Sequence, residues 1–139
     1  MNRVTREFVS KQRIAHLATA DRFGSPLVVP ICFVTDDNDL LYTALDSKPK
    51  SVKPGKLKRL SNINENASVS VVFDTYSEDW NELAYVIVFG KAKLLTDTER
   101  GYYAEKLLRK KYPQYETILC VGAPIIQVSI NRTKTWGLV

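Results

Sequence analysis

The feature that most constrains the fold is a series of short segments rich in β-branched and aromatic residues, separated by turn-forming residues. In one of them Val69, Val71 and Phe73 alternate mostly with serine, the period-two pattern of a strand with one buried face. Short strands with short connections predict an antiparallel sheet closed into a small barrel, since closure removes exposed edges. Six such segments span residues 13–21, 27–35, 40–45, 67–76, 84–95 and 123–136.

Three intervening segments have the features of helices. Residues 4–12 suit a short helix with Thr5 as a candidate N-cap, and the leucine and isoleucine residues within 57–63 are spaced for one helical face. Residues 96–115 begin with capping and acidic residues and end with basic ones, which complements a helix dipole. The predicted fold class is therefore mainly β, a six-stranded barrel with flanking helices that forms one domain over residues 1–139.

Four glycine and proline positions refine this prediction. Gly24 permits a positive φ in a turn, and Pro26 presets φ at the start of the following strand. Pro30 removes a ladder donor, so its strand should border an edge, a bulge or a ligand. Gly90, inside a long apolar segment, predicts a bulge or a bend.

The overall charge and the rare residue types narrow the function classes. A net charge of +5 favours an anionic partner, whether nucleic acid, an anionic membrane or a phosphorylated small molecule. Without an apolar signal region or a long apolar run, the chain is expected to be cytoplasmic, with no membrane partner. Cys32 and Cys120 lie in apolar runs and are expected to be reduced and buried. His16 has no neighbouring Cys or His cluster, so no metal site is predicted.

The basic run "DSKPKSVKPGKLKRL", residues 46–60, raises the question of what it binds. It holds six of the twenty lysine and arginine residues and only one acid. A solvated loop, a nucleic-acid backbone and the phosphate of a bound cofactor would each explain such a run.

Three longer stretches carry a resemblance to a known family. The stretches "ATADRFGSPLVVPICFVTDDNDLLYTAL", "KRLSNINENASVSVVF" and "VFGKAKLL" together resemble the pyridoxamine-phosphate-oxidase-like split-barrel proteins, which bind FMN or the deazaflavin coenzyme F-420. The resemblance covers about residues 13–95 and, more loosely, the C-terminal strand. "DSKPK", "DTYSEDW" and "RTKTWG" look most like the deazaflavin-dependent branch.

This resemblance implies a homodimer with FMN or the deazaflavin in a groove between the subunits. It implies an oxidoreductase that transfers hydride or electrons to an unidentified small molecule, with the chemistry supplied by the cofactor. A carrier or sensor that binds the same cofactor without turnover would use identical binding residues. Nucleic-acid binding by a small basic barrel is a third hypothesis, disfavoured because the aromatic residues are not interleaved with the basic ones.

The resemblance also assigns candidate cofactor-binding residues. A basic pair at a helix start would hold the phosphate, and the lysines of the preceding loop are an alternative or additional grip. The strand hydroxyls would bond the phosphate or the ribityl chain, the backbone around Pro30 would contact the ring edge, and two tryptophans would wall the ring from the same or the partner chain. The candidates are Val29, Pro30, Ile31, Tyr42, Thr43, Lys48, Lys50, Lys58, Arg59, Asn62, Trp80 and Trp136; no catalytic residue is assigned.

Overall fold

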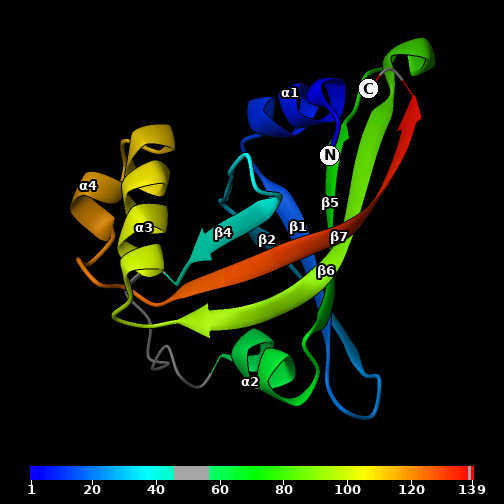
Figure 1. The fold of residues 1–139 in the computed structure, drawn as a ribbon. Coiled ribbons are helices and arrows are strands. Elements are labelled where there is room, and N and C mark those ends of the chain that lie inside the picture. Colours follow the sequence, from blue (N-terminus) through cyan, green and yellow to red (C-terminus); the bar gives the residue numbers. More distant parts are fainter. Residues whose placement is uncertain (46–56, 138) are drawn as a thin grey trace.

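A curled antiparallel sheet organises the molecule in the computed structural model, which describes residues 1–45, 57–137 and 139 (Figure 1). Its strand order is β2-β1-β5-β6-β7-β4-β3. The predicted mainly β class and split-barrel architecture are confirmed, but the sheet has seven strands instead of six. The strands are β1 (Ala15–Ala20), β2 (Pro26–Ile31), β3 (Val34–Thr35), β4 (Leu40–Ala44), β5 (Ser68–Thr75), β6 (Ala84–Leu95) and β7 (Ile125–Gly137).

The additional strand arises because the expected strand 27–35 is interrupted at Cys32 and Phe33. The backbone N–H of Phe33 donates to the Tyr112 hydroxyl at 3.0 Å, and that hydroxyl also lies 3.0 Å from the Phe33 carbonyl. These contacts take the place of ladder hydrogen bonds, so β2 ends and β3 begins on opposite edges of the sheet. Because only two residues join the two edges, the sheet must curl until its edges are adjacent, and we call this junction the seam.

Helices close the ends of the barrel and cover part of its outside. They are α1 (Arg3–Lys11), α2 (Lys58–Glu65), α3 (Glu99–Lys111) and α4 (Tyr115–Ile118), with a short 3₁₀ helix η2 (Trp80–Glu82). The cap of α1 is Asn2, whose side chain accepts from the Thr5 N–H, so the Thr5 cap was wrong. The sequence pattern missed α4 and η2, which are too short to show a helical period. Among the described residues no helix has the length and apolarity needed to cross a bilayer.

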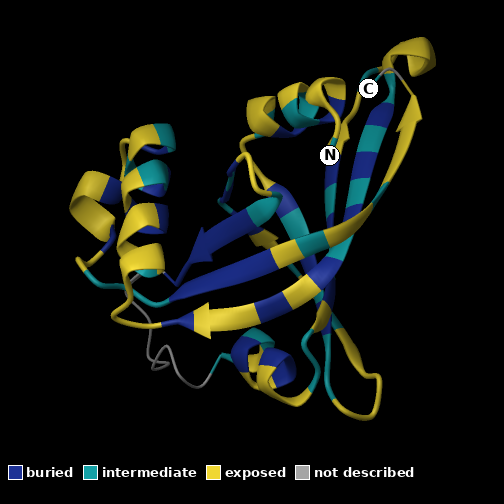
Figure 2. Ribbon diagram, in the orientation of Figure 1, coloured by how far each residue is buried: buried dark blue, intermediate teal, exposed yellow. Residues whose placement is uncertain are grey.

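Two hydrophobic clusters lie on opposite sides of the curled sheet, and the residues that form them are among those coloured as buried in Figure 2. The first fills the barrel, where Leu17, Phe33 and Phe73 are fully buried and Val9 of α1 and Ile63 of α2 close the two ends. The second lies outside β3, β4 and the start of β7, beneath α3 and α4. The outward face of β2, β1, β5, β6 and the end of β7 has no helix over it in the described chain (Figure 1).

The predicted glycine and proline positions behave as expected. Gly24 has φ 82°, β2 begins at Pro26, and Pro30 lies on an edge strand that pairs only with β1. The register of β6 against β7 shifts between Phe89 and Gly90, which confirms the bulge. A side chain at Gly90 would collide with the backbone carbonyl of Ser129.

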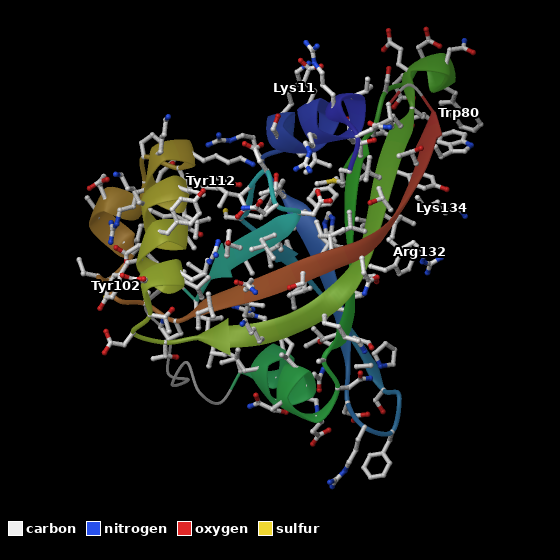
Figure 3. The ribbon with its side chains drawn as sticks, viewed as in Figure 1. Lys11, Trp80, Tyr102, Tyr112, Arg132 and Lys134 are labelled. Carbon is white, nitrogen blue, oxygen red and sulfur yellow. The ribbon has the colours of Figure 1, made fainter. Side chains whose placement is uncertain are left out.

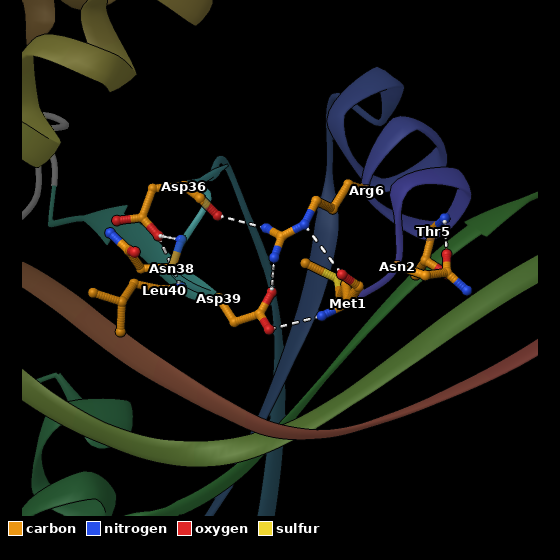
Figure 4. Close-up of polar contacts among 8 residues, drawn as sticks. All are labelled: Met1, Asn2, Thr5, Arg6, Asp36, Asn38, Asp39 and Leu40. Atoms are coloured by element: carbon orange, nitrogen blue, oxygen red, sulfur yellow. Dashed lines mark hydrogen bonds and ion pairs between the residues drawn. The ribbon is translucent and has the colours of Figure 1, made fainter.

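Polar contacts hold α1 against the β3–β4 turn (Figure 4). The Arg6 guanidinium pairs with Asp39 at 2.7 Å and donates to the Asp36 carbonyl at 2.9 Å. The Met1 amine contacts the same Asp39 carboxylate at 2.7 Å. This end of the barrel is therefore closed by charge pairs as well as by Val9.

Candidate functional site

The start of α2 presents a basic pair at one end of the barrel. The Lys58 side chain is 59% exposed, and Arg59 beside it is half-buried. Leu57 occupies the cap position and supplies no side-chain acceptor, so no described residue caps the first backbone N–H groups of the helix with its side chain. Cationic side chains beside such N–H groups form a favourable setting for a phosphate.

Asp21, the acid that pairs with Lys58 among the described residues, already accepts hydrogen bonds from backbone donors. Asp21, in the β1–β2 turn, lies 3.9 Å from the Lys58 amine. Hydrogen bonds from the backbone N–H groups of Ser25 and Phe23 lower the pKa of Asp21, and the nearby Lys58 charge adds a smaller effect in the same direction. Because Asp21 does not depend on Lys58 for its hydrogen bonds, the amine is available to a second anion.

Asn62 positions α2 and does not face solvent. Its side chain is fully buried and donates from Nδ2 to the Thr19 hydroxyl of β1 at 3.0 Å. Its Oδ1 has no hydrogen-bond partner within residues 1–45, 57–137 and 139. The predicted role of Asn62 as a direct cofactor contact is therefore not supported in the single chain, where it anchors the helix that carries the basic pair.

Tyr42 and Thr43 are also buried, on opposite faces of β4. The Tyr42 hydroxyl donates to Asp36 Oδ2 at 3.0 Å and receives a longer bond from Arg100 at 3.4 Å. Burial raises the pKa of Tyr42 to about 12. In the single chain this hydroxyl is therefore bonded to Asp36 and Thr43 is only 3% exposed, so their assignment as cofactor ligands stays a prediction.

The predicted ring-contacting strand lies at the open edge of the sheet. The Ile31 side chain belongs to the barrel core, Val29 packs partly against it, and Pro30 points outward and is exposed. On its free edge β2 has no strand partner among the described residues. The backbone groups on this edge are therefore not used in a ladder by any described strand.

A shallow apolar depression, which we call the His16 hollow, lies on the uncovered outward face. It has a volume of about 350 Å³ and is lined by His16, Val72, Asp74, Tyr85 and Ile87. His16 is directly opposite Pro30 in the β1–β2 pair. The sequence reasoning missed this feature, although strand alternation places His16 on the outward face and could have indicated it.

The two predicted tryptophans gather at the far end of the same face. The Trp136 ring stacks on Tyr85 with centroids 5.5 Å apart, and Trp80, at the start of η2, is 73% exposed. Figure 3 shows Trp80 at the opposite end of the sheet from α2. From Ser68, which follows α2, to Asp74, which is paired with Tyr85, β5 covers about 20 Å.

The structure thus separates the candidate residues into two groups within one chain. Lys58 and Arg59 lie at the α2 end, whereas Trp80 and Trp136 lie at the other end with the His16 hollow between the two ends of the face. Lys48 and Lys50 fall outside the described residues.

Cys32 is half-buried and Cys120 is exposed, which corrects the expectation that both are buried. Across the described ranges no group of three or more His, Cys, Asp or Glu side chains is arranged to hold a metal.

Comparison with known proteins supports this architecture. The family model described as pyridoxamine 5'-phosphate oxidase matches residues 1–133. No curated protein sequence matches the chain at a significant level.

Several solved structures share the fold at low sequence identity. A protein of unknown function from Agrobacterium tumefaciens has a TM-score of 0.76 and 18% identity; the alignment covers 99% of this chain but 56% of that one. A FAD-binding protein from Mesorhizobium loti has a TM-score of 0.68 and 21% identity over 94% of this chain and 88% of its own. A heme storage protein from Vibrio cholerae has a TM-score of 0.72 and 13% identity, covering 96% and 91%.

Proposed function

Because the chain belongs to the pyridoxamine 5'-phosphate oxidase family, we propose that it is a homodimeric oxidoreductase that binds FMN or the deazaflavin coenzyme F-420. The observation that carries this proposal is the basic pair at the start of α2, exposed Lys58 and half-buried Arg59, at the position where the family resemblance assigns the phosphate. The chemistry of the donors fits a phosphate monoester, since arginine and backbone N–H groups bind its oxygens with directional hydrogen bonds.

The uncovered outward face supports the dimer. Val28 and Trp136 on this face are 59% and 51% exposed, and Val72 and Ile87 are half-buried in the single chain. An apolar sheet face of this kind is stabilised when a second copy covers it in a self-complementary contact. A two-fold pairing that reverses the strand direction would bring the tryptophan end of one copy towards the basic pair of the other.

In this arrangement each group of the chain has a defined role. Lys58, Arg59 and the first N–H groups of α2 hold the phosphate, the backbone of β2 contacts the ring edge, and the partner's aromatic end excludes water from the ring. When bound, the cofactor supplies the hydride or electron transfer. The protein contributes position, electrostatics and a dry pocket, so no nucleophile is required.

Titration with separate cofactors tests the proposal. FMN and the deazaflavin should be added individually to purified protein while absorbance and fluorescence are recorded. We expect one of them to bind with a Kd below about 10 μM, and the Lys58→Ala/Arg59→Ala double variant to weaken it at least tenfold, about 1.4 kcal/mol. Lys11→Ala, an exposed lysine on α1 at the opposite end of the barrel from α2, is the control. Binding of neither cofactor below about 100 μM would contradict the proposal.

A cofactor carrier or sensor without turnover uses the same site and is distinguished by kinetics. The loaded protein is first reduced chemically, and its reoxidation is then followed with each acceptor offered. If reoxidation is never faster than that of the free cofactor, the oxidoreductase proposal fails while the binding proposal stands. If an acceptor accelerates reoxidation and the double variant abolishes the acceleration, the enzyme proposal is supported.

The His16 hollow favours one second candidate, heme binding. A single imidazole in an apolar depression is a suitable axial ligand for heme iron. Hemin should be included in the titration, with His16→Ala as the variant. A Soret shift that His16→Ala removes and Lys58→Ala/Arg59→Ala preserves would favour heme over a flavin.

A further inference from the structure

The seam between β2 and β3 carries a lysine in an unusual environment. The Lys111 amine, at the end of α3, lies 3.8 Å from the centre of the Phe33 ring and 5.4 Å from that of Tyr112. The side chain is half-buried, while Phe33 beneath it is fully buried. The amine is therefore held against the barrel wall instead of extending into water.

The charges around this amine are of the same sign as its own. The Arg13 guanidinium lies 4.6 Å from the centre of the Tyr112 ring, on the ring that Lys111 also approaches. Within the described chain Lys111 forms no ion pair with a carboxylate. Burial and the neighbouring Arg13 charge lower the pKa of Lys111 to about 8, against a smaller opposite effect of Cys32.

Hydrogen bonds of Tyr112 fix the backbone beneath the Lys111 amine. The Tyr112 hydroxyl lies within 3.0 Å of the Phe33 N–H and carbonyl and 2.9 Å from the Arg13 carbonyl. This network holds the seam, the start of β1 and the end of α3 together. The Phe33 ring favours the charged amine by a cation–π contact, but it offers no hydrogen-bond acceptor to the ammonium protons.

We propose that Lys111 is the preferred acylation site of this protein, where its side-chain amine accepts an acyl group from an acyl thioester. The neutral amine attacks the thioester carbonyl, the C–N bond forms as the C–S bond breaks, and the departing thiolate takes up the amine proton. The product is a neutral amide, which removes a half-buried charge near Arg13. Acylation is therefore favoured at this lysine both by the availability of its lone pair and by relief of like-charge repulsion.

The helix itself provides matched comparisons. Lys106 and Lys110 lie on α3 and are exposed. At pH 7.5 roughly a quarter of Lys111 is neutral, against about one in a thousand for a lysine of ordinary pKa. The lower basicity of Lys111 reduces its intrinsic nucleophilicity, so the net advantage is expected to be about tenfold.

Acetylation by acetyl-coenzyme A, followed by peptide mass spectrometry, tests the proposal on the full chain. At pH 7.5 the rate at Lys111 should exceed the rates at Lys106 and Lys110 about tenfold. Between pH 8 and 9.5 the rate at Lys111 should level off while the other two continue to rise. A rate at Lys111 equal to or below those of its neighbours, or one that keeps rising tenfold per pH unit, would overturn it.

Two variants test whether the charge of Arg13 at the seam affects the acetylation rate of Lys111. Arg13→Gln removes the neighbouring cation and keeps the backbone carbonyl that Tyr112 contacts, so it should slow acetylation of Lys111 at pH 7.5 several-fold. Lys11→Gln, on the exposed side of α1, should leave the rate unchanged. Equal rates in wild type and Arg13→Gln would contradict the proposed environment, and the wild-type pH profile remains decisive if a variant does not fold.

Discussion

The buried hydroxyl of Tyr42 donates to the Asp36 carboxylate, so we expect it to stabilise the fold. Tyr42→Phe should destabilise the fold by about 1–2 kcal/mol, because Asp36 loses a buried hydrogen bond. Cofactor affinity should not change, since the hydroxyl does not reach the proposed site. Urea unfolding and the FMN or deazaflavin titration measure the two effects. Tyr103→Phe, exposed and in ring contact with Tyr42, is the control; a loss of affinity in Tyr42→Phe would support the original ligand assignment.

Lys111 makes a distinct contribution to the pH dependence of stability. Its folded pKa of about 8 lies below the ordinary lysine value, so the unfolded chain binds more protons at that position between pH 8 and 10. Stability should therefore rise with pH over this window, and the half-buried charge of Lys111 should weaken the fold below pH 8. Lys111→Met should be more stable than wild type at pH 7, and the difference should shrink by pH 9.5. Parallel curves from urea unfolding would contradict this.

At the scale of single residues, the sequence predicted backbone roles better than side-chain partners. Gly24, Pro26, Pro30 and Gly90 were placed correctly because their conformational limits are local. The burial of Tyr42 and Asn62 was not predictable, because it depends on Asp36 and Thr19, which the fold brings from other elements.

The β6–β7 pair depends on a bulge that only glycine can form. Gly90→Ala should destabilise the fold by about 2–4 kcal/mol, because the new methyl group collides with the Ser129 carbonyl. Gly24 has a positive φ but open space around it, so Gly24→Ala should lower the free energy of unfolding by only about 1 kcal/mol. Thermal or urea unfolding of both variants provides the comparison, and equal losses would show that the close approach is relieved by backbone movement.

At the scale of elements, long periodic segments were predictable and short ones were not. The segment 84–95 has the bounds of β6, because a continuous apolar pattern marks it from end to end. The segment 27–35 splits at the seam because a tyrosine hydroxyl from α3 takes the backbone groups of Phe33, an interaction between residues 79 positions apart. The four-residue α4 likewise depends on Arg109, which bonds the carbonyls of Tyr115 and Leu119.

At the scale of the whole molecule, the uncovered sheet face should be a subunit interface. Ile87→Lys places a charge in the centre of that face and should shift the protein towards monomer in sedimentation velocity. Val121→Lys makes the same chemical change at a position that is 82% exposed beyond α4, and it should leave the assembly unchanged. If both variants sediment like wild type, the subunits do not meet through this face.

The sequence predicted the mainly β split barrel correctly, because the alternation of apolar residues and the turn residues between the strands favour a curled antiparallel sheet. The location of the site was only partly predictable. The basic pair could be assigned to a helix start, but its separation from the tryptophans by the length of β5 became apparent only in the structure. This separation is the reason for proposing that a second copy completes the site.

Mixing two defective variants tests this shared site most directly. One variant lacks the basic pair, Lys58→Ala/Arg59→Ala, and the other lacks the aromatic end, Trp80→Ala/Trp136→Ala. After the subunits exchange, half of the dimers should be mixed, and each mixed dimer should contain one intact site. The 1:1 mixture should therefore regain about a quarter of the wild-type capacity for FMN or the deazaflavin at unchanged affinity. No recovery of high-affinity sites, with mixed dimers shown to form, would contradict a site built across two copies.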